Sequence, residues 1–422
     1  MRHLYTFLFY LILPFIFLRL LWRSRRIPGY RQGWAERLGY CPFRLEKSIW
    51  VHAVSVGETI AALPLIKILL QEYPDLPLVV TNMTPTGAAR VRAAFKDSVK
   101  QVYIPYDLPT AVNRFLQRIN PQIAIVMETE LWPNLFEGCR KHNVPIVVLN
   151  ARLSGKSALG YSQIPSLTRD IFHSIHAMAA QTSADAERFI KLGLSREKIT
   201  VTGNLKFDLE LPADLSDKSE ALHNHLGKER LTWIAASTHQ GEEEIILTAH
   251  RLVLKKFPDA LLILVPRHPD RFAAVAALAN QQGFTAARRS SGEVCSPQTQ
   301  IYLGDTMGEL LLLYSVAQVA FVGGSFARVG GHNMLEPAAL RKPVITGPVL
   351  FNFVEISEMM VKAQGMIIVQ DVDELADEVE RLFENKQYRD SMGESAYQVV
   401  AANRGALLRQ VELVKLRMSY PT

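Results

Sequence analysis

The chain has 422 residues, which is enough for two or three domains, and its 48% hydrophobic content allows each of them its own core. A net charge of +6 favours work near an anionic surface, but no Lys/Arg tract is interleaved with aromatic residues, which argues against a nucleic-acid-binding protein. The three scattered cysteines argue for a reducing compartment and against a disulfide framework or a cysteine-rich metal site.

The N-terminal residues 1–25 are predicted to form a membrane anchor. Residues 4–18 are almost wholly apolar, and the stretch reaches spanning length if it continues to Trp22 with Arg19 snorkelling. Arginines follow the apolar stretch, which places the rest of the chain in the cytoplasm by the positive-inside rule. A cleaved signal peptide is disfavoured because no small-residue cleavage site follows. An interfacial helix lying in the membrane surface is the alternative to a spanning anchor.

Residues 26–210 alternate between apolar strand-like runs and helical patterns, which predicts a doubly wound parallel sheet. The expected strands cover residues 49–53, 78–82, 101–105, 123–127, 145–150 and 177–181. Ligands of such sheets bind beyond the carboxyl ends of the strands. That rule places Glu58, Asn82, Glu128 and Asn150 on one rim.

Glu58 is the strongest catalytic candidate on this rim. It follows Gly57 at the opening of a helix, where a carboxylate could take the proton of an acceptor alcohol as a general base. A first-turn glutamate is also favoured simply by the helix dipole, worth less than about 1 kcal/mol. The pattern alone does not decide between these two interpretations.

Three further residues of this half are weaker candidates. Glu128 and Glu130 flank Thr129 and point the same way in an extended chain, so they could divide acid and base roles, hold a metal, or cap a loop. We expect Glu128 to contribute to a sugar site and Glu130 to be structural. Arg152 and Lys206 could each meet an anion, or could be solvated surface cations.

Residues 211–422 restart the alternation, with strands expected at 231–236, 260–265, 300–305 and 319–322 and a further strand with its loop at 342–348. Arg267 follows the second of these strands and could pair with a phosphate. The turn at 237–242 is a possible anion cradle. Asp371-Val372-Asp373 matches a metal-binding pattern, but it precedes a helix and is better read as an N-cap, so no metal is implied. The helices near the chain's end, residues 396–417, are expected to pack across the domain junction.

The stretch 323–337 is the most informative in the chain. It contains two glycine pairs, and their backbone could approach a ligand closely. A helix is expected to begin near His332 or Asn333, and its free N–H groups would favour a phosphate. Glu336, in the first turn, suits the vicinal diol of a ribose. These parts describe a pocket for a nucleotide sugar, and the alternative is a glycine-rich turn with a solvated glutamate.

The motifs found in order along the chain resemble those of the Kdo (3-deoxy-D-manno-octulosonic acid) transferases of lipopolysaccharide synthesis. The resemblance covers nearly the whole chain, including the N-terminal apolar segment. Besides the stretch 323–337, it rests on Ser55-Val56-Gly57-Glu58, Met127-Glu128-Thr129-Glu130-Leu131-Trp132-Pro133, Gly203-Asn204-Leu205-Lys206-Phe207 and Val265-Pro266-Arg267-His268.

The resemblance implies an α/β fold of the GT-B type, in which two Rossmann-like domains, residues 26–210 and 211–422, face a cleft. It implies inverting transfer of Kdo from CMP-Kdo to the lipid A precursor (lipid IVA), with Glu58 as the general base. Glu128, Arg152 and Lys206 become candidates for the acceptor or sugar site. The implied donor-binding residues are Pro266, Arg267, Met307, Gly308, Glu309, Asn333, Met334, Leu335 and Glu336.

The resemblance also bears on cofactors, partners and location. No metal and no cofactor beyond the donor substrate is expected, since CMP leaves with a single phosphate. The expected partners are CMP-Kdo, the lipid A precursor and the inner membrane of a Gram-negative bacterium, with the catalytic domains on its cytoplasmic side and no nucleic acid. Two alternatives stay open, namely a GT-B transferase using another nucleotide sugar and a membrane-tethered nucleotide-binding protein without catalysis. The number of Kdo units added is not determined by the sequence.

Overall fold

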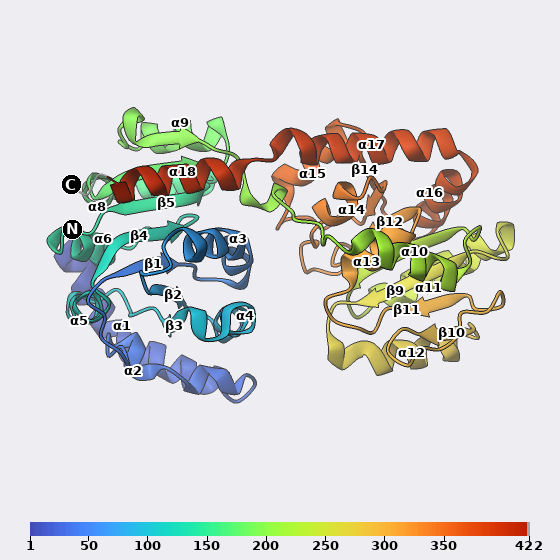
Figure 1. Ribbon diagram of the computed structural model, residues 1–422, viewed down its shortest axis with the longest axis horizontal. Helices are drawn as coiled ribbons and strands as arrows, with labels where there is room; N and C mark the ends of the chain where they lie inside the picture. The colour runs from blue at the N-terminus through green and yellow to red at the C-terminus, as the bar shows by residue number, and fades with distance from the viewer. Residues whose placement is uncertain (420–422) are drawn as a thin grey trace. The chain divides into compact units, whose positions relative to one another are not determined.

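The computed structural model describes residues 1–419, and they fold into two compact units. The first unit consists of residues 1–208 together with the end of the chain from Arg404 onward. The second unit consists of Leu209–Asn403. Each unit has its own seven-stranded sheet with helices packed on its faces (Figure 1). The predicted pair of doubly wound domains is thereby confirmed as a fold class.

The sheet of the first unit is parallel throughout, in the order β3-β2-β1-β4-β5-β6-β7. Its central strands are buried on both faces, as expected for near-continuous apolar runs between helical layers. Successive strands are added to one side of β1 up to β3 and to its other side from β4 onward. The carboxyl ends of β1 and β4 are therefore the topological switch point. The strands are β1 Ser48–His52, β2 Leu78–Asn82, β3 Lys100–Tyr103, β4 Pro121–Met127, β5 Ile146–Ala151, β6 Ile175–Ala180 and β7 Ile199–Val201.

The helices of this unit begin at short polar residues or at proline, as N-terminal capping preferences require. Ser55, Thr84, Ser154 and Thr182 each accept a hydrogen bond from the backbone of the first turn that follows. The helices are α2 Trp34–Arg37, α3 Val56–Glu72, α4 Pro85–Phe95, α5 Pro109–Ile119, α6 Pro133–Lys141, α7 Gly155–Ser162, α8 Pro165–His173 and α9 Ser183–Lys191.

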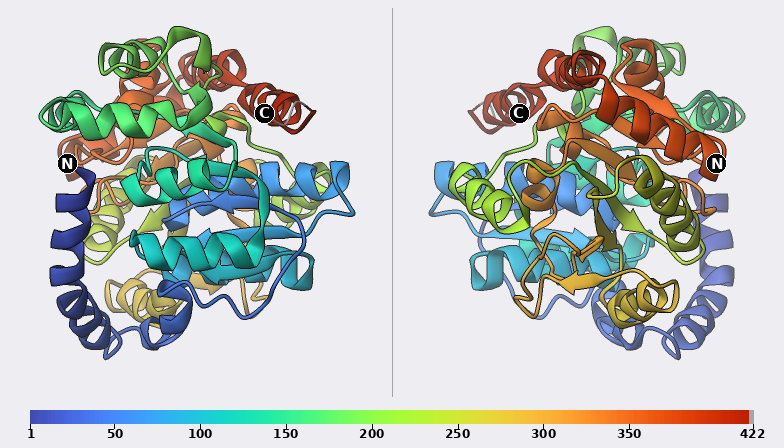
Figure 2. Two further views of the ribbon diagram at one scale, coloured as in Figure 1. Left: turned by 90° about the vertical axis from the view of Figure 1, so that its left-hand side faces the viewer. Right: turned by 90° about the vertical axis from the view of Figure 1, so that its right-hand side faces the viewer.

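The predicted anchor is a single helix, α1 Arg2–Arg23, and it runs along one side of the first unit (Figures 1 and 2). Arg2 forms an ion pair with Glu137, and Thr6 hydrogen-bonds Asn134 at 3.1 Å. Leu20 is buried, while the opposite face of the helix leaves large apolar side chains exposed. By length and composition the helix could cross a membrane, and it is the one such helix within the described residues.

The sheet of the second unit is also parallel and has the order β10-β11-β9-β8-β12-β13-β14, so its switch point lies between β8 and β12. Its strands are β8 Thr232–Thr238, β9 Leu261–Pro266, β10 Ala286–Arg288, β11 Ile301–Leu303, β12 Val319–Val322, β13 Val344–Thr346 and β14 Met366–Ile368. The helices packed around it are α10 Leu215–Leu226, α11 Glu242–Lys256, α12 Phe272–Gln281, α13 Leu310–Val316, α14 Leu335–Ala339, α15 Val354–Lys362, α16 Val372–Glu384 and α17 Lys386–Asn403.

The last helix, α18 Ala406–Ser419, belongs to the first unit, although the boundary predicted from the sequence assigned residues 211–422 to the second domain. Its apolar residues Leu407, Val411 and Val414 join the core formed by β1, β4 and α3, because their helical spacing gives one continuous apolar face. Asp208 fixes the start of this helix. Its carboxylate accepts the N–H groups of Gly405 at 2.5 Å and Leu407 at 2.6 Å.

Replacing Asp208 with alanine should lower the free energy of unfolding by about 1–2 kcal/mol, because it removes the acceptor for the orphan N–H groups at the start of α18. Chemical denaturation followed by circular dichroism measures this change. Glu210→Ala, which removes an exposed carboxylate two residues further on, is the matched control and should change stability by less than about 0.5 kcal/mol. Equal effects of the two variants would contradict the capping role.

Candidate functional site

Each unit presents a cluster of functional side chains at the switch point of its sheet. In the first unit the cluster begins with Glu58, which lies in the first turn of α3 directly after β1. Its side chain is 6% exposed and turns back in a capping box, accepting the N–H of Val54 at 2.7 Å and of Ser55 at 3.2 Å. Glu58 therefore has the helix-start role that the dipole favours, and these hydrogen bonds hold its carboxylate fixed at the rim of the sheet.

The protonation of Glu58 is set by its surroundings. Burial raises the pKa of Glu58 to about 7, against the opposing hydrogen bond with Ser55. The nearby carboxylates of Glu130 and Glu128 act in the same direction as burial. A carboxyl group whose pKa lies near neutrality is suited to general base catalysis, since at neutral pH it is partly ionised and is basic enough to accept a proton.

Glu128 and Glu130 follow β4, on the other side of the switch point. Glu128 has a φ of +55°, a left-handed conformation that non-glycine residues adopt at a cost of about 1–3 kcal/mol and that gathers at functional sites. Glu130 accepts a hydrogen bond from the indole of Trp132 at 2.9 Å, and burial raises its pKa. Glu130 therefore has a packing partner, as expected of a structural residue, whereas no hydrogen bond is given to the Glu128 carboxylate within the described residues.

The other residues predicted on this rim serve mainly to hold loops together. Asn82 is buried, and its amide donates to Ala53 O and to Thr59 Oγ1, both at 2.9 Å. Asn150 is buried with a φ of +54°, and its side-chain oxygen accepts the N–H of Leu205 at 3.0 Å. The two asparagines are therefore buried residues whose hydrogen bonds hold the loops of the rim in place.

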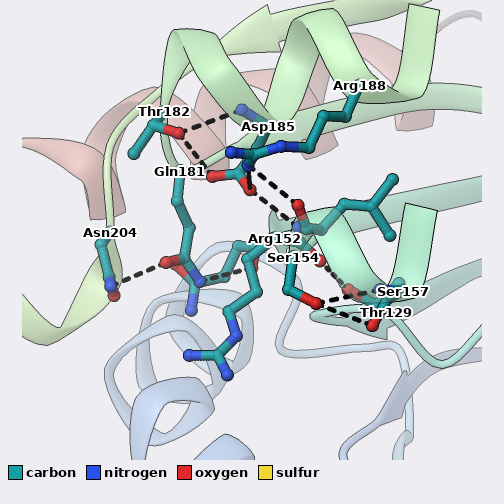
Figure 3. A network of polar contacts seen from close by, with 11 residues as sticks. Thr129, Arg152, Ser154, Ser157, Gln181, Thr182, Asp185, Arg188 and Asn204 are labelled. Carbon is teal, nitrogen blue, oxygen red and sulfur yellow. Dashed lines mark hydrogen bonds and ion pairs between the residues drawn. The ribbon is translucent and has the colours of Figure 1, made fainter. Parts of the chain in front are cut away.

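Arg152 lies one strand further along the rim, at the end of β5, and is exposed. Its carbonyl accepts the hydroxyl of Thr129, so it is tied to the loop that carries the two glutamates. Figure 3 shows the Arg152 side chain extending away from the cluster of Asp185 and Arg188, which makes its own polar contacts. Lys206 is half-buried in the turn after β7, where its N–H donates to Asn204 at 3.0 Å.

In the second unit the glycine-rich loop after β12 differs from the prediction. The buried carboxylate of Glu242, in the first turn of α11, accepts the N–H groups of Gly324 at 2.7 Å and of Ser325 and Phe326 at 2.9 Å. It also accepts the N–H of His239 at 2.9 Å. The predicted phosphate cradles at 237–242 and at the first glycine pair are therefore both occupied by one side chain of the protein.

The glycines of this loop are required by packing inside the protein. Gly324 has a φ of +69°, and a Cβ there would lie 2.7 Å from the ring of His332. Gly330 has a φ of +100°, and a Cβ there would lie 2.5 Å from Phe351. Both conformations and both spacings exclude other residues. The glycines are therefore required for the loop to fold tightly on its neighbours, and the expectation that they bring backbone close to a ligand stays a prediction.

Three imidazoles and one guanidinium gather where β8, β9 and β12 end. The Nε2 atoms of His239 and His332 lie 2.8 Å apart with their rings nearly parallel, and the ring of His268 meets His239 edge-on. Burial is the main cause that lowers the pKa of His332 to about 4, and the positive charge of Arg267 acts in the same direction. The cluster places the hydrogen-bonding groups of its imidazoles next to one permanent cation, which suits an anionic group with hydrogen-bond acceptors.

The predicted donor-binding residues lie at the carboxyl end of this sheet. Asn333 bonds the carboxylate of Glu336 at 3.1 Å, and burial raises the pKa of that carboxylate, which the charge of Arg267 opposes. Pro266, Met334 and Leu335 are buried and shape the backbone, while Met307 and Gly308 are exposed. The guanidinium of Arg289 donates a hydrogen bond to the carboxylate of Glu309, with an N–O distance of 2.8 Å.

Two histidines of this cluster, His239 and His332, and the neighbouring Glu242 were not predicted as site residues. A weak signal existed for Glu242, since it follows a glycine in the first turn after the first strand, in the same position as Glu58. The stacking of His239 on His332 joins residues 93 apart in the chain, so no local pattern indicates it.

The aspartates at 371 and 373 are confirmed as part of a helix start. The carboxylate of Asp371 accepts the N–H groups of Asp373 at 3.1 Å and Glu374 at 3.0 Å. Across the part of the chain that the structure describes, no group of three or more His, Cys, Asp or Glu side chains is arranged to hold a metal ion. The expectation of metal-independent chemistry stays a prediction.

Two switch-point clusters on two parallel sheets define the class of protein as a GT-B type glycosyltransferase fold. A family model described as 3-deoxy-D-manno-octulosonic-acid transferase matches residues 32–209, and one described as glycosyl transferases group 1 matches residues 229–399. The crystal structure of MnaA from S. aureus with UDP has a TM-score of 0.55 at 17% identity, covering 89% of this chain and 97% of that one, which shows the fold alone.

The sequence relatives are more specific. A 3-deoxy-D-manno-octulosonic acid transferase of Haemophilus influenzae is 45% identical over 420 residues, covering 98% of both chains. That of Bordetella pertussis is 35% identical, covering 98% of this chain and 99% of its own. The chain therefore belongs to the 3-deoxy-D-manno-octulosonic acid (Kdo) transferases, glycosyltransferases of lipopolysaccharide synthesis, and the predicted resemblance is confirmed.

Proposed function

We propose that the protein transfers Kdo from CMP-Kdo to the lipid A precursor (lipid IVA) with inversion at the anomeric carbon. Glu58 takes the proton of a sugar hydroxyl of the acceptor as the oxygen of that hydroxyl forms the new glycosidic bond. The bond from the anomeric carbon to the CMP phosphate breaks, and CMP leaves with the electron pair.

The observation that carries this proposal is the state of Glu58. A buried carboxyl group, fixed by the N–H groups of Val54 and Ser55, has a pKa raised to about 7 beside two other glutamates at a switch point. Removing a proton from an alcohol in the transition state calls for a base of this kind. Arg152 and Glu128, joined through the Thr129 contact, are proposed to meet the acceptor or the sugar, and Lys206 is proposed to hold an anionic group.

The second unit is proposed to hold the donor. Arg267 and the neighbouring imidazoles would bind the phosphate and stabilise its charge as CMP departs. Glu336, whose carboxylate is held by Asn333, would accept the ribose hydroxyls. Pro266, Met307, Gly308, Glu309, Met334 and Leu335 would form the rest of the CMP site. The single phosphate of CMP makes a divalent ion less necessary than a pyrophosphate would.

The N-terminal helix is proposed to hold the protein on the cytoplasmic side of the inner membrane. Because α1 contacts the first unit from Arg2 to Leu20, the structure favours the interfacial alternative, with the exposed apolar face of the helix in the lipid. Spanning the bilayer would require these contacts to separate.

Incubating the purified protein with CMP-Kdo and tetraacyl lipid A precursor, and reading the product mass, tests the proposed function directly. A mass increase of one or more Kdo units is expected, and it also counts the units added. Release of CMP without a new lipid product would overturn the acceptor assignment. Product formed only from another nucleotide sugar would favour the alternative donor.

Donor selectivity gives a separate expected result. CMP should raise the melting temperature more than UMP or UDP at equal concentration, because at a fixed concentration the ligand with the lower Kd stabilises the folded state more. Arg267→Ala should weaken CMP binding about tenfold by removing a charge-assisted contact to phosphate. Lys362→Ala, which removes an exposed cation elsewhere on the second unit, is the control and should bind CMP normally. A larger shift with UDP would point to a different donor.

A further inference from the structure

A cavity of about 400 Å³ lies between α1 and the rim of the first sheet. Its size falls within the range of roughly 300–1,000 Å³ typical of small-molecule sites. One wall is the helix itself, and the other comes from loops at the carboxyl ends of the strands. The lining residues are Tyr5, Phe9, Ile16, Arg19, Leu20, Arg23, Tyr30, Arg37, Met83, Thr84, Tyr106, Asp107 and Trp132.

This cavity adjoins the loops that carry the catalytic candidates. Met83 follows β2, and its N–H donates to the carbonyl of Val54 at 3.2 Å, four residues before Glu58. Trp132, on the other side, donates its indole N–H to Glu130 at 2.9 Å. Two residues of the cavity wall, Met83 and Trp132, are therefore hydrogen-bonded to residues that surround Glu58.

The cavity combines an apolar lining with uncompensated positive charge. Arg37 is fully buried, and its guanidinium lies 4.3 Å from the ring centre of Tyr103 and donates to Met83 O at 2.9 Å. Its Nε has no hydrogen-bond partner. Among residues 1–419, neither Arg37 nor the exposed Arg19 and Arg23 forms an ion pair with a carboxylate.

The carboxylate in the cavity wall does not offset these arginines. Asp107 accepts the N–H groups of Asn134 at 3.0 Å and Leu135 at 2.7 Å, so it is engaged by the start of α6. A buried cation without a counter-ion is costly. The unused Nε of Arg37 is itself buried, so the guanidinium groups open to a phosphate are those of the two exposed arginines.

We infer that this cavity holds a phosphate-bearing, acylated part of the lipid acceptor, with the phosphate on Arg19 and Arg23, beside the buried charge of Arg37, and an acyl chain along the apolar face of α1. The helix is then one wall of the acceptor site as well as an attachment to the membrane. The inference rests on the proposed function. Its commitment to the acceptor, rather than to a bulk phospholipid, comes from the cavity's attachment to the loops around Glu58.

Kinetics in micelles of a neutral detergent test the charged part of the site. The double variant Arg19→Ala, Arg23→Ala should raise KM for tetraacyl lipid A precursor about tenfold, since two contacts to phosphate are lost. KM for CMP-Kdo should not change. The matched control Arg25→Ala, Arg26→Ala removes the same charge from the adjoining exposed segment and should change the acceptor KM less than twofold. Equal effects of the two double variants would overturn the assignment.

Photocrosslinking tests occupancy without relying on turnover. p-Benzoylphenylalanine is placed at Ile16, which lines the cavity, or at Leu18, which is 61% exposed and, two residues further on, lies on the opposite face of α1. In mixed micelles of phospholipid and lipid A precursor, the probe at position 16 should capture the precursor, and the probe at position 18 should capture phospholipid or detergent. Capture of phospholipid alone at position 16, with normal transfer activity, would overturn the inference and leave the proposed function intact. Absence of any transfer by the unmodified protein would instead overturn the proposed function, whatever the crosslinks show.

Discussion

Glu58→Gln should reduce kcat by roughly a hundredfold to ten-thousandfold, which is the usual contribution of a general base. Glutamine keeps the size of the side chain and can still accept from the backbone in a capping box, so the fold should be retained. The protein should still bind CMP, because the proposed donor site lies in the other unit. Transfer of Kdo measured by product mass, together with a CMP thermal shift, separates these two properties.

The pH dependence of the unaltered protein provides a second readout. A base must be ionised to act, so kcat/KM should fall as the pH decreases through about 7, where Glu58 becomes protonated. Glu58→Gln should abolish this limb of the profile. Glu130→Gln, which removes a neighbouring carboxylate, should keep the limb and move it to lower pH, because Glu130 raises the pKa of Glu58. Near-normal activity of Glu58→Gln would leave Glu58 with a structural role only.

Glu242→Ala should destabilise the protein by about 3–5 kcal/mol, the second-largest effect that we expect. The substitution leaves the N–H groups of His239, Gly324, Ser325 and Phe326 without their acceptor in a buried loop, and such unpaired groups are costly. Because the loop also carries Gly330 to Glu336, CMP binding should weaken with it. Denaturant titration and a CMP thermal shift measure the two effects.

Glu244 supplies the control for this prediction. It lies in the same first turn of α11 but is exposed, so Glu244→Ala removes an equal charge from the helix start without unpairing any backbone group. Its effect should stay below about 1 kcal/mol, the size of a helix-dipole contribution. If Glu242→Ala were no more damaging than Glu244→Ala, the carboxylate would not be what holds the glycine-rich loop.

Most of the fold could be predicted from the sequence because parallel strands buried on both faces leave a clear pattern. Runs such as 123–127 and 260–265 are continuous in apolar residues and bounded by polar loops, and they became β4 and β9. The rim positions of Glu58, Glu128 and Arg267 followed from the general rule for doubly wound sheets. The end of the chain was placed in residues 211–422 with its helices packing across the domain junction, and α18 joins the core of the first unit, since its amphipathic pattern shows that it packs but not on which sheet.

The candidate site was predictable only where its chemistry is local. Glu336 and Asn333 are three residues apart, and their contact follows from helix geometry. The contacts of Glu242 with Gly324 and Ser325 span more than eighty residues, so the sequence could not show that the loop's N–H groups were already used. The anchor helix was likewise predicted from the length of its apolar stretch and the arginines that follow it, and the cavity between this helix and Arg37 was invisible until the tertiary structure placed them together.

Glu58 and Glu242 occupy equivalent places, each directly after a glycine in the first turn behind the first strand of its sheet. A carboxylate has about four lone-pair sites. Five backbone donors converge on Glu242, counting Ala327 at 3.4 Å, so that side chain is saturated. Glu58 receives only two, and it keeps acceptor capacity for a hydroxyl from outside. The same dipeptide thus supplies a fully engaged carboxylate in one half of the molecule and, in the other half, a carboxylate with acceptor capacity left for an external hydroxyl, and counting the donors tells them apart.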